Sequence, residues 1–581
     1  MFKQLKKLKW FLKERARHYI IGILFLQLTN LIVILPPIII GRAVDSISDG
    51  SITGAELFTD ISYLTAILTV EYIFGYIWAY EIFLNAIIID LRLRAMMMKK
   101  ILTMPRTFFE KFSSGDLMSR ATSDIDTISE MLGYGVLAIS DGIGYLLAII
   151  LAMGFTVSWK LTIVSILPLP ILTMLTSYVG EYIHKLYMAQ QEAFSKMSDE
   201  VLENVNGIRV IRSYVLEKQS VKNFENTTED VFNKSLKTEL VASTFWPATK
   251  IFTSISYAIA IGYGVNLILT GEITVGSLIS FNVYLGYLIW PMYAIGDFIN
   301  TAQRGTTSIE RIYEVLEEDD DVENKKITRN IDGFDNIKFS DYTFRYPNSK
   351  NVNLRGIDLE ITRGKTIGIV GRTGSGKSTL IKQLLKEYPV GDGNISIDDL
   401  SISEVQKSSL MNEIGYVSQD NILFSKTIRE NILMGKKSAS EEELFEVIRI
   451  SDLLRDVDLF ANKMDTLVGE RGVAISGGQK QRISIARAVI KDPYLLIMDD
   501  SLSAVDSRTE TKIIENIREN RKNKTTIIVT HRLSAVSYAD EIIVLDDGVI
   551  VERGTHEELI LKDGWYNRQY HIQQMEEKED E

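Results

Sequence analysis

Six long apolar stretches limit what this chain of 581 residues can fold into. Each stretch has at least about 20 residues, which is the length an α-helix needs to cross the hydrocarbon core of a bilayer. Because lipid offers no hydrogen-bond partners, a spanning segment must satisfy its own backbone polar groups, as a helix does. The sequence therefore predicts an all-α domain of six spanning helices near Tyr19–Ile40, Ile61–Ile89, Leu132–Val157, Leu161–Ile183, Phe245–Leu269 and Leu278–Ile299.

Basic residues outside these stretches predict how the helices are oriented. Lys and Arg are frequent in Lys3–Arg17, Arg92–Arg120 and Lys185–Lys237, whereas the other three connections carry almost none. Basic connections stay on the cytoplasmic side, so we expect a multi-pass protein of the cytoplasmic membrane with both termini in the cytoplasm. The residues up to Lys13 are expected to form a basic amphipathic elbow helix at the bilayer surface.

Two acidic residues inside the spans are candidate substrate contacts. Carboxylates in a membrane are costly and usually face the interior of a helix bundle or a wet cavity. Glu71 and Asp297 lie deep in the predicted spans, and Glu71 has several aromatic neighbours in the sequence. Both could contact a cationic amphipathic substrate, to which aromatic rings would add cation–π contacts. An interhelical hydrogen bond made by a structural carboxyl group is the alternative.

The second half of the chain has a different composition. From about Gly305 onward, charged residues and short alternating runs replace the long apolar stretches. We expect a transmembrane domain over 1–305, a linker over 306–330, a soluble α/β domain over 331–572 and an acidic tail over 573–581. The net charge of −12 without a basic stripe argues against a nucleic-acid partner. The absence of cysteine excludes disulfides and cysteine-ligated metals.

A glycine-rich turn carries the strongest chemical signal of the second half. The apolar run Thr366–Val370 precedes it and the helix-like run Leu380–Leu385 follows it. This is the order of a phosphate-binding loop, in which backbone N–H groups and a helix N-terminus face the anion. Lys377 adds a positive charge, and Ser378 adds a hydroxyl ligand for Mg²⁺. We expect this P-loop to bind a nucleoside triphosphate through Gly371, Arg372, Thr373, Gly374, Ser375, Gly376, Lys377, Ser378 and Thr379.

A carboxylate at the end of a second buried strand predicts the other part of a metal site. Leu495–Met498 has the composition of a buried strand, and Asp499 follows it directly. Ligand-binding residues gather at the carboxyl ends of parallel strands. Nucleotide chemistry needs such a carboxylate beside the Mg²⁺ that Ser378 would bind. We therefore expect the side chains of Asp499 and Ser378 to lie close together.

Four further motifs give the chain a family resemblance. Tyr416–Asp420, Ile475–Arg482, Tyr494–Ser501 and Ile527–Arg532 follow the P-loop in this order. With the six-helix domain ahead of them, they make the chain resemble a half-transporter of the ATP-binding cassette exporter family over essentially its full length. The resemblance is specific because the Ser-Gly-Gly-Gln signature of that family stands at Ser476–Gln479.

This resemblance implies roles for single residues. It assigns adenine stacking to Tyr346, Mg²⁺ contact and a catalytic role to Gln419, catalysis to His531 and nucleotide contact to Asp506. It also assigns nucleotide contact across a dimer to Ser476, Gly477, Gly478 and Gln479. Val468–Gly472 would be an exporter-specific loop, and the turns near Gly115 and Ile208 would be the coupling helices that this loop contacts. ATP would lie between the P-loop of one half and the signature of another, so one copy of each motif requires a dimer.

One position departs from the family pattern. The residue after the metal aspartate is ordinarily a glutamate that acts as general base, whereas here it is Asp500. Ser501 and Leu502 also replace the usual proline and threonine. A shortened carboxylate predicts that this chain's own P-loop holds ATP but hydrolyses it poorly. The pattern is similar to the degenerate-site subunit of heterodimeric bacterial multidrug exporters, and a slow homodimer in which Asp500 still serves as base is the alternative.

The resemblance leaves several functions open. ATP-driven export of hydrophobic or cationic compounds is the leading hypothesis, with the lipid bilayer and a glutamate-bearing second chain as partners and ATP and Mg²⁺ as cofactors. A lipid or peptide exporter, or an ATP-gated membrane protein that does not pump, would share the same motifs. Retention of Gln419, His531 and the signature favours a pump over a gated protein.

Overall fold

The protein, here a computed structural model, consists of two compact units. The helical unit comprises Met1–Leu102 and Gly115–Glu317, and the αβ unit comprises Thr103–Ser114 and Glu318–Glu581. The short segment Thr103–Ser114 thus belongs to the αβ unit, although helices of the other unit flank it in the sequence. The structure describes residues 2–322, 329–469 and 475–580.

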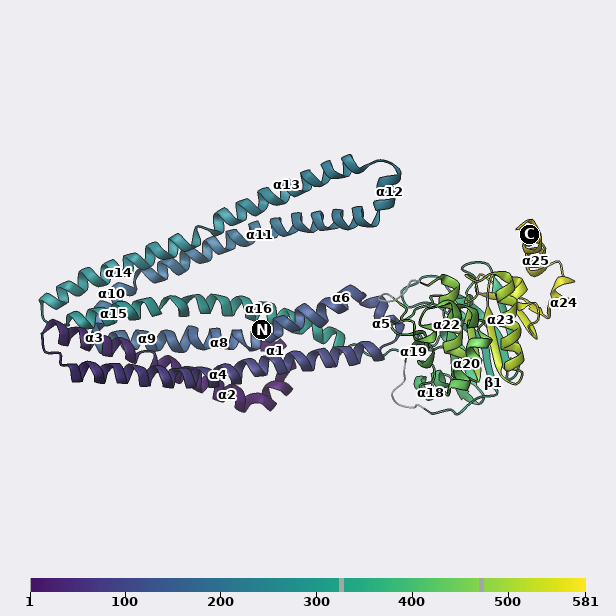
Figure 1. The fold of residues 1–581 in the computed structure, drawn as a ribbon, viewed down its shortest axis with the longest axis horizontal. Coiled ribbons are helices and arrows are strands. Elements are labelled where there is room, and N and C mark those ends of the chain that lie inside the picture. Colours follow the sequence, from purple (N-terminus) through teal and green to yellow (C-terminus); the bar gives the residue numbers. More distant parts are fainter. Residues whose placement is uncertain (1, 323–328, 470–474, 581) are drawn as a thin grey trace. The chain divides into compact units, whose positions relative to one another are not determined.

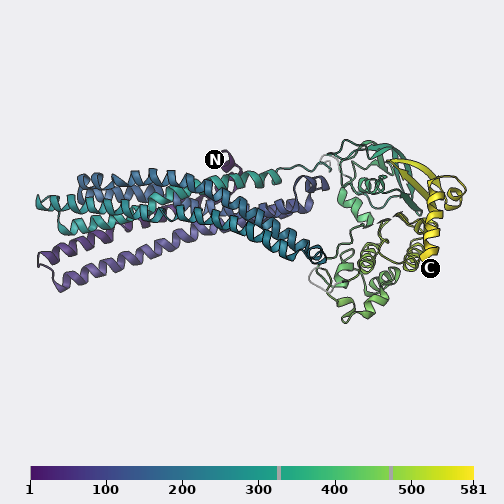
Figure 2. The same cartoon turned by 90° about the horizontal axis from the view of Figure 1, so that it is seen from above.

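Long helices build the helical unit (Figure 1). Two of them, α11 and α13, lie side by side in both views (Figures 1 and 2). The elements are α1 (Phe2–Leu5), the 3₁₀ turn η1 (Lys6–Leu8), α2 (Lys9–Ile32), α3 (Leu35–Ser48), α4 (Gly54–Thr103), α6 (Ser114–Ser119), the π-helical turn η2 (Arg120–Asp124), α7 (Ile125–Leu132), α8 (Tyr134–Ser140), the π-helical turns η3 (Asp141–Tyr145) and η4 (Gly154–Ser158) around α9 (Leu146–Met153), α10 (Trp159–Ile166), α11 (Pro168–Asn206), α12 (Ile208–Ser213), α13 (Glu217–Ala242), α14 (Phe245–Leu269), α15 (Val275–Tyr287) and α16 (Ile289–Leu316).

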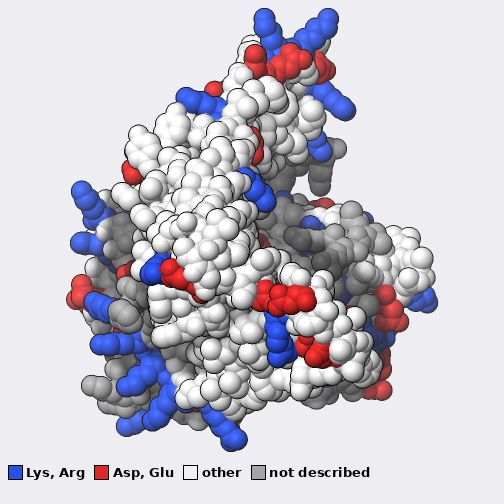
Figure 3. All heavy atoms as spheres, turned by 90° about the vertical axis from the view of Figure 1, so that its left-hand side faces the viewer, with Lys and Arg blue, Asp and Glu red and all other residues white. Residues whose placement is uncertain are grey.

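Among the described residues, five helical stretches are long and apolar enough to cross a membrane. They are Lys3–Ser48, Gly54–Thr103, Ser114–Leu172, Glu217–Leu269 and Val275–Leu316. The predicted span Leu161–Ile183 falls on α10 and the start of α11 and is not a separate stretch among these five. Viewed from the end where α3 leads into α4, the described surface consists mostly of uncharged residues (Figure 3). A helical membrane domain is thus confirmed, whereas the sixth span stays a prediction.

Two glycines allow α3 and α15 to pack closely. A Cβ atom built on Gly276 would lie 1.8 Å from the carbonyl oxygen of Gly41, and one built on Gly41 would lie 2.7 Å from the carbonyl oxygen of Gly276. Only a residue without a side chain fits at either position. The contact is polar as well, because the carboxylate of Asp45 accepts hydrogen bonds from the backbone N–H of Gly276 at 2.7 Å and the hydroxyl of Thr274 at 2.6 Å.

We expect Gly276→Ala to destabilise the helical unit. The added methyl group would overlap backbone atoms of α3, and overpacking of this kind costs about 1–3 kcal/mol. The thermal midpoint of the purified full-length protein in detergent should fall. Gly262→Ala on α14 is the matched control, because a Cβ atom there has no neighbour within 4 Å. Equal midpoints for the two variants would contradict close packing of α3 on α15.

Two sheets form the framework of the αβ unit. One is antiparallel with the order β2-β1-β4-β5, and the other has the order β10-β9-β3-β8-β7-β6. In the larger sheet β9, β3, β8, β7 and β6 run parallel, and β10 is antiparallel to β9. The strands are β1 (Asn336–Phe344), β2 (Leu354–Thr362), β3 (Thr366–Gly371), β4 (Asp392–Ile397), β5 (Leu400–Ser401), β6 (Ile414–Val417), β7 (Leu495–Asp499), β8 (Thr525–Val529), β9 (Glu541–Asp546) and β10 (Val549–Gly554).

The helices of the αβ unit cover these sheets, and apolar strand residues supply much of the core. Every residue of β7 and β8 is buried, as expected for central strands of a parallel sheet. The helices are α5 (Arg106–Lys111), α17 (Lys377–Leu384), α18 (Lys407–Glu413), α19 (Ile428–Leu433), α20 (Glu441–Ile450), α21 (Leu454–Leu459), α22 (Gly477–Val489), α23 (Ser507–Asn520), α24 (His556–Ile560) and α25 (Trp565–Asp580), with 3₁₀ turns η5 (Lys463–Asp465) and η6 (Leu533–Val536).

Candidate nucleotide-binding site

The predicted P-loop connects the central strand β3 to helix α17. Gly371, Gly374 and Gly376 have φ angles of 147°, 83° and 104°, a region that favours glycine. Space is also restricted, because a Cβ atom on Gly371 would lie 2.1 Å from the carbonyl oxygen of Leu545. Helix α17 then begins at Lys377, so its first backbone N–H groups face the loop. The predicted strand, loop and helix are thus present, with a geometry that suits a phosphate chain.

The side chain of Lys377 lies folded over this loop. Its Nζ donates to the carbonyl oxygens of Gly371 at 2.9 Å and Arg372 at 2.8 Å. Burial lowers the pKa of Lys377 from its ordinary value, and the nearby carboxylates of Asp500 and Asp499 oppose that shift. A buried ammonium group at the mouth of an anion-binding loop is a cation available to a phosphate.

Oxygen ligands gather at the carboxyl ends of the neighbouring strands. The hydroxyl of Ser378 donates to Oδ1 of Asp499 at 3.2 Å, as the sequence predicted for the side chains that would share Mg²⁺. Asp499 ends β7 and is 4 % exposed, and this burial raises its pKa from the ordinary value. Gln419 follows β6, and its Nε2 donates to Oδ2 of Asp500 at 3.5 Å. Four predicted residues therefore lie together at one edge of the sheet.

This set of side chains fits a magnesium nucleotide. Mg²⁺ prefers hard oxygen ligands and is usually held by one or two carboxylates together with phosphate oxygens and water. Ser378, Asp499 and the amide oxygen of Gln419 are donors of this kind. A metal ion would also favour the ionised form of Asp499, whose burial otherwise favours the neutral form.

Asp500 itself has an unusual backbone conformation. Its φ is 45°, in the left-handed region that aspartate tolerates better than most side chains. Its N–H donates to the carbonyl oxygen of Val529 at 2.8 Å, and its carbonyl oxygen accepts from the hydroxyl of Ser503 at 3.1 Å. The residue is therefore fixed by β8 on one side and by the following turn on the other.

The predicted adenine-stacking residue lies close to the P-loop helix. The hydroxyl of Tyr346 is 3.0 Å from that of Thr379 in α17. Its ring contacts Tyr388 edge-to-face at a centroid distance of 4.8 Å, and Nζ of Lys382 lies 5.8 Å from the ring centroid. Sequence reasoning placed Tyr346 at the nucleotide site, and the bond to Thr379 brings it next to the P-loop.

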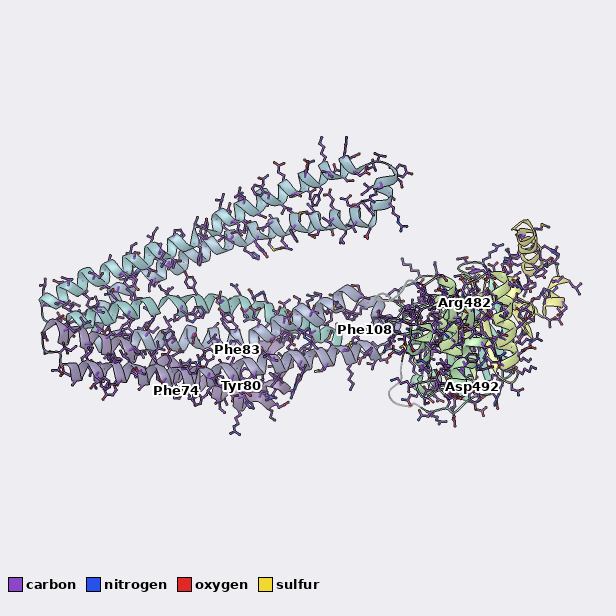
Figure 4. All side chains as sticks on the ribbon, viewed as in Figure 1. Phe74, Tyr80, Phe83, Phe108, Arg482 and Asp492 are labelled. Carbon is purple, nitrogen blue, oxygen red and sulfur yellow. The ribbon has the colours of Figure 1, made fainter. Side chains whose placement is uncertain are left out.

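The signature residues form the start of helix α22. Ser476 is the N-cap, and its hydroxyl and the side chain of Gln479 satisfy each other's backbone N–H groups at 3.2 and 3.0 Å. Asp456 accepts hydrogen bonds from Gln479 at 3.0 Å and Arg482 at 2.7 Å; Arg482 is labelled in Figure 4. No hydrogen bond or ion pair between described residues joins positions 476–479 to the P-loop of the same chain.

The remaining nucleotide-site predictions fall near the same edge. Asp506 caps α23 by accepting the N–H of Thr509 at 2.9 Å, and this bond lowers its pKa. His531 follows β8, the strand between β3 and β7, and its side chain is exposed. The central residues of the predicted exporter-specific loop, 470–472, lie outside the described residues.

The two predicted substrate contacts lie on different helices, α4 and α16. Asp297 on α16 is exposed and accepts a hydrogen bond from Tyr134 at 2.9 Å. Glu71 lies on α4, which also carries Phe74, Tyr80 and Phe83 (Figure 4). No hydrogen bond between described residues joins Glu71 to Asp297.

Another carboxylate within the predicted spans, Asp141, is buried. Asp141 is 7 % exposed and accepts hydrogen bonds from the side chains of Asn30 and Trp290, both at 3.0 Å. The sequence places Asp141 inside a span but gives no sign that residues from two distant helices surround it.

Segment Thr103–Ser114 is the part of the αβ unit that sequence reasoning missed. Phe108 is 2 % exposed (Figure 4), and Glu110 accepts a hydrogen bond from the hydroxyl of Tyr388, which is also 2 % exposed. Arg106 pairs with Glu387 at 3.4 Å. The sequence predicts the tip of this connection near Gly115; the structure places Gly115 in α6, with the short helix α5 just before it.

This fold and site define an ATP-binding cassette transporter. Residues 19–292 match the family described as "ABC transporter transmembrane region", and residues 354–503 match the family described as "ABC transporter". The chain belongs to this family. The predicted combination of a helical transmembrane domain followed by an ATP-binding α/β domain is therefore confirmed.

Named relatives are similar to almost the whole chain. The probable multidrug resistance ABC transporter ATP-binding/permease protein YheI of Bacillus subtilis (strain 168) is 45% identical over 99% of this chain and 98% of its own length. The multidrug resistance-like ATP-binding protein MdlA of Escherichia coli (strain K12) is 34% identical over 98% and 96%. The structure of a bacterial Atm1-family ABC exporter with ATP bound superposes with a TM-score of 0.79 at 24% identity, over 97% of this chain and 98% of that one, and shows the shared fold.

Proposed function

We propose that this chain is one half of a dimeric exporter that uses ATP to move hydrophobic or amphipathic compounds across the cytoplasmic membrane. Its bacterial relatives carry multidrug-transporter names. The observation that carries the proposal is the pairing of Ser378 with Asp499 at the mouth of the P-loop. The described residues of the same chain also include five helical stretches long and apolar enough to cross a membrane.

Each residue of the site has a defined task in this proposal. Backbone N–H groups of Gly371–Ser378 and the ammonium group of Lys377 bind the phosphates, and Tyr346 stacks on adenine. Ser378, Asp499 and Gln419 hold Mg²⁺, which when bound neutralises charge on the transferred phosphoryl group. Asp500 and His531 orient the attacking water, and Asp500 occupies the position of the general base, where its shorter side chain makes proton transfer slow.

A second chain is needed to complete the site. The proposal assigns nucleotide contact to positions 476–479, yet no described polar contact joins them to the P-loop of their own chain. The tip of the α11–α13 hairpin also offers a surface for a partner, because no residue of α12 is buried. Val210 is 58% exposed, and Tyr214, just after the helix, is 73% exposed.

The aspartate at position 500 favours a heterodimer over a homodimer. A glutamate is one methylene longer, so Asp500 holds its carboxylate about 1.5 Å short of the position for a general base. A misplacement of about 1 Å can cost roughly a hundredfold in rate. The intact signature of this chain would then complete the active site of a partner that carries the glutamate.

The proposed orientation of the helices in the membrane rests on the connections rich in Lys and Arg, which stay on the cytoplasmic side. In this proposal six helices span the membrane and both termini are cytoplasmic. The transmembrane domain lies within 1–305 and the nucleotide-binding domain covers 331–572, with Thr103–Ser114 packed as part of the αβ unit. Glu71 and Asp297 remain proposed contacts for cationic groups of the substrate.

We expect ATP-dependent dye uptake into inverted vesicles only when this chain is co-expressed with a glutamate-bearing half-transporter. Dyes, lipids and peptides should be offered in parallel, because they separate multidrug export from lipid or peptide export. ATP turnover by the pair should clearly exceed that of either chain alone. Equal turnover by this chain alone would contradict the heterodimer, and nucleotide binding without uptake of any compound would favour a gated protein.

A further inference from the structure

Helix α25 forms hydrogen bonds with the backbone of His531 and of Leu533, the residues on either side of Arg532. One side-chain amide makes both contacts. Nε2 of Gln573 donates to the carbonyl oxygen of His531 at 2.7 Å, and Oε1 of Gln573 accepts the N–H of Leu533 at 2.9 Å. The amide thus pairs with the segment as a neighbouring strand would, and both of its polar groups are used.

Arg532 ties the same segment to the turn that follows Asp500. Its guanidinium donates to the carboxylate of Glu510 at 2.5 Å and to the carbonyl oxygen of Val505 at 3.2 Å. Glu510 is 3 % exposed, so the acceptor of this ion pair is buried, whereas the guanidinium of Arg532 is partly exposed. The His531 segment is therefore held from one side by α23 and its preceding turn, and from the other side by α25.

The start of α25 is firmly anchored, which fixes where Gln573 can reach. Tyr566 is 0 % exposed, its ring stacks on Tyr570 at 6.3 Å, and its hydroxyl lies 2.8 Å from Nδ1 of His556. Residues at positions i, i+4 and i+7 share one face of a helix. Gln573 follows Tyr566 by seven residues and so lies on the anchored face.

The segment held by Gln573 has little other regular structure. Strand β8 ends at Val529 and η6 begins at Leu533, so His531 lies in the short link between them. Its exposed side chain can keep one direction only if the backbone of this link is fixed. The amide of Gln573 fixes that backbone directly before and directly after Arg532.

We propose that Gln573 is a positioning residue of the nucleotide site, which holds His531 in the orientation needed to contact bound nucleotide. The inference rests on the proposed function in one respect, namely that His531 faces ATP bound to this chain. It gives α25 an influence on how long the chain retains its nucleotide, although the helix contributes no residue to the P-loop.

The test compares Gln573→Leu, Gln573→Glu and the matched control Gln574→Leu in the full-length chain with its partner. Gln574 is the adjacent glutamine, and its amide donates to the hydroxyl of Tyr570 within α25 at 2.9 Å. Amide hydrogen exchange over residues 530–536, measured without nucleotide, reports how strongly the hydrogen bonds of Gln573 hold this segment. The second measurement is the rate at which a fluorescent ATP analogue leaves the P-loop of this chain. It is made in a pair whose partner chain cannot bind nucleotide, and it reports whether His531 is held in position.

Gln573→Leu loses both hydrogen bonds. We expect exchange at Leu533 and release of the analogue each to accelerate by about 3- to 10-fold, the size expected for the one hydrogen bond on which each measurement depends. Gln573→Glu keeps the acceptor for Leu533 but cannot donate to His531, so it should restore much of the protection at Leu533 while release stays fast. Gln574→Leu should match the wild type in both measurements, and the thermal midpoint should change little in all three variants.

Two results would overturn the proposal. Unchanged exchange in Gln573→Leu would show that the amide does not hold the segment, and faster exchange with unchanged release would show that its role is structural only. A failure of the proposed function looks different, because the wild-type chain itself would then bind no analogue.

Discussion

Asp500→Glu should raise ATP hydrolysis at this chain's own P-loop by about a hundredfold. The longer side chain would bring a carboxylate to the place where a general base can accept the proton of the attacking water. The measurement is the ATPase rate of the full-length pair with the partner's own glutamate replaced by glutamine, so that the site at Asp500 dominates the signal.

Asp500→Asn is the control for this prediction. It retains the size of aspartate and its tolerance for the left-handed conformation at φ 45°, but it cannot accept a proton. Its hydrolysis should fall below that of the wild type if Asp500 retains some activity as a base. A glutamate variant that binds ATP and folds normally, yet hydrolyses no faster than the asparagine variant, would contradict the assignment of position 500.

Lys377→Ala should weaken ATP binding by this chain by about 10- to 100-fold. A hydrogen bond to a charged group contributes roughly 1.5–3 kcal/mol, and Lys377 is the P-loop cation whose ammonium group is buried over the loop. Its Nζ lies within hydrogen-bond distance of the loop carbonyls at Gly371 and Arg372, so it is already held over the position of the phosphates. Titration of the full-length chain with a fluorescent ATP analogue measures the loss.

Loss of Lys377 also removes two bonds within the loop, so folding must be checked separately. The thermal midpoint of the variant and the hydrogen exchange of β3 report on the loop itself. Lys365→Ala, at an exposed lysine just before β3, is the matched control and should bind as the wild type does. Unchanged affinity in a correctly folded Lys377→Ala protein would show that the phosphates lie elsewhere.

Much of the nucleotide site could be predicted because its signals are local. The glycine pattern between Thr366–Val370 and Leu380–Leu385 fixes a strand, a tight loop and a helix within about 20 residues. The pairing of Ser378 with Asp499 joins positions far apart in the sequence, yet it followed from the rule that parallel strands end at one edge. The structure places the two side chains 3.2 Å apart.

The contacts that could not be predicted depend on packing between distant segments. Nothing in the sequence around Gln573 indicates that its amide meets the link before η6, and nothing near Asp456 indicates that it accepts from Gln479. The burial of Asp141 likewise depends on which faces of α2 and α16 turn inward. Such choices are made by side-chain packing between elements, and the local pattern of residues within one element does not encode them.

Because α5 belongs to the αβ unit, a fragment meant to contain that unit alone must include α5. A fragment that starts at Glu318 would leave out Thr103–Ser114, which the fold assigns to the same body. The buried hydroxyl of Tyr388 would then lose Glu110 as its acceptor, and an unpaired buried polar group costs about 1–3 kcal/mol. Truncation at the apparent linker therefore removes a piece of the ATPase that is encoded more than 200 residues upstream.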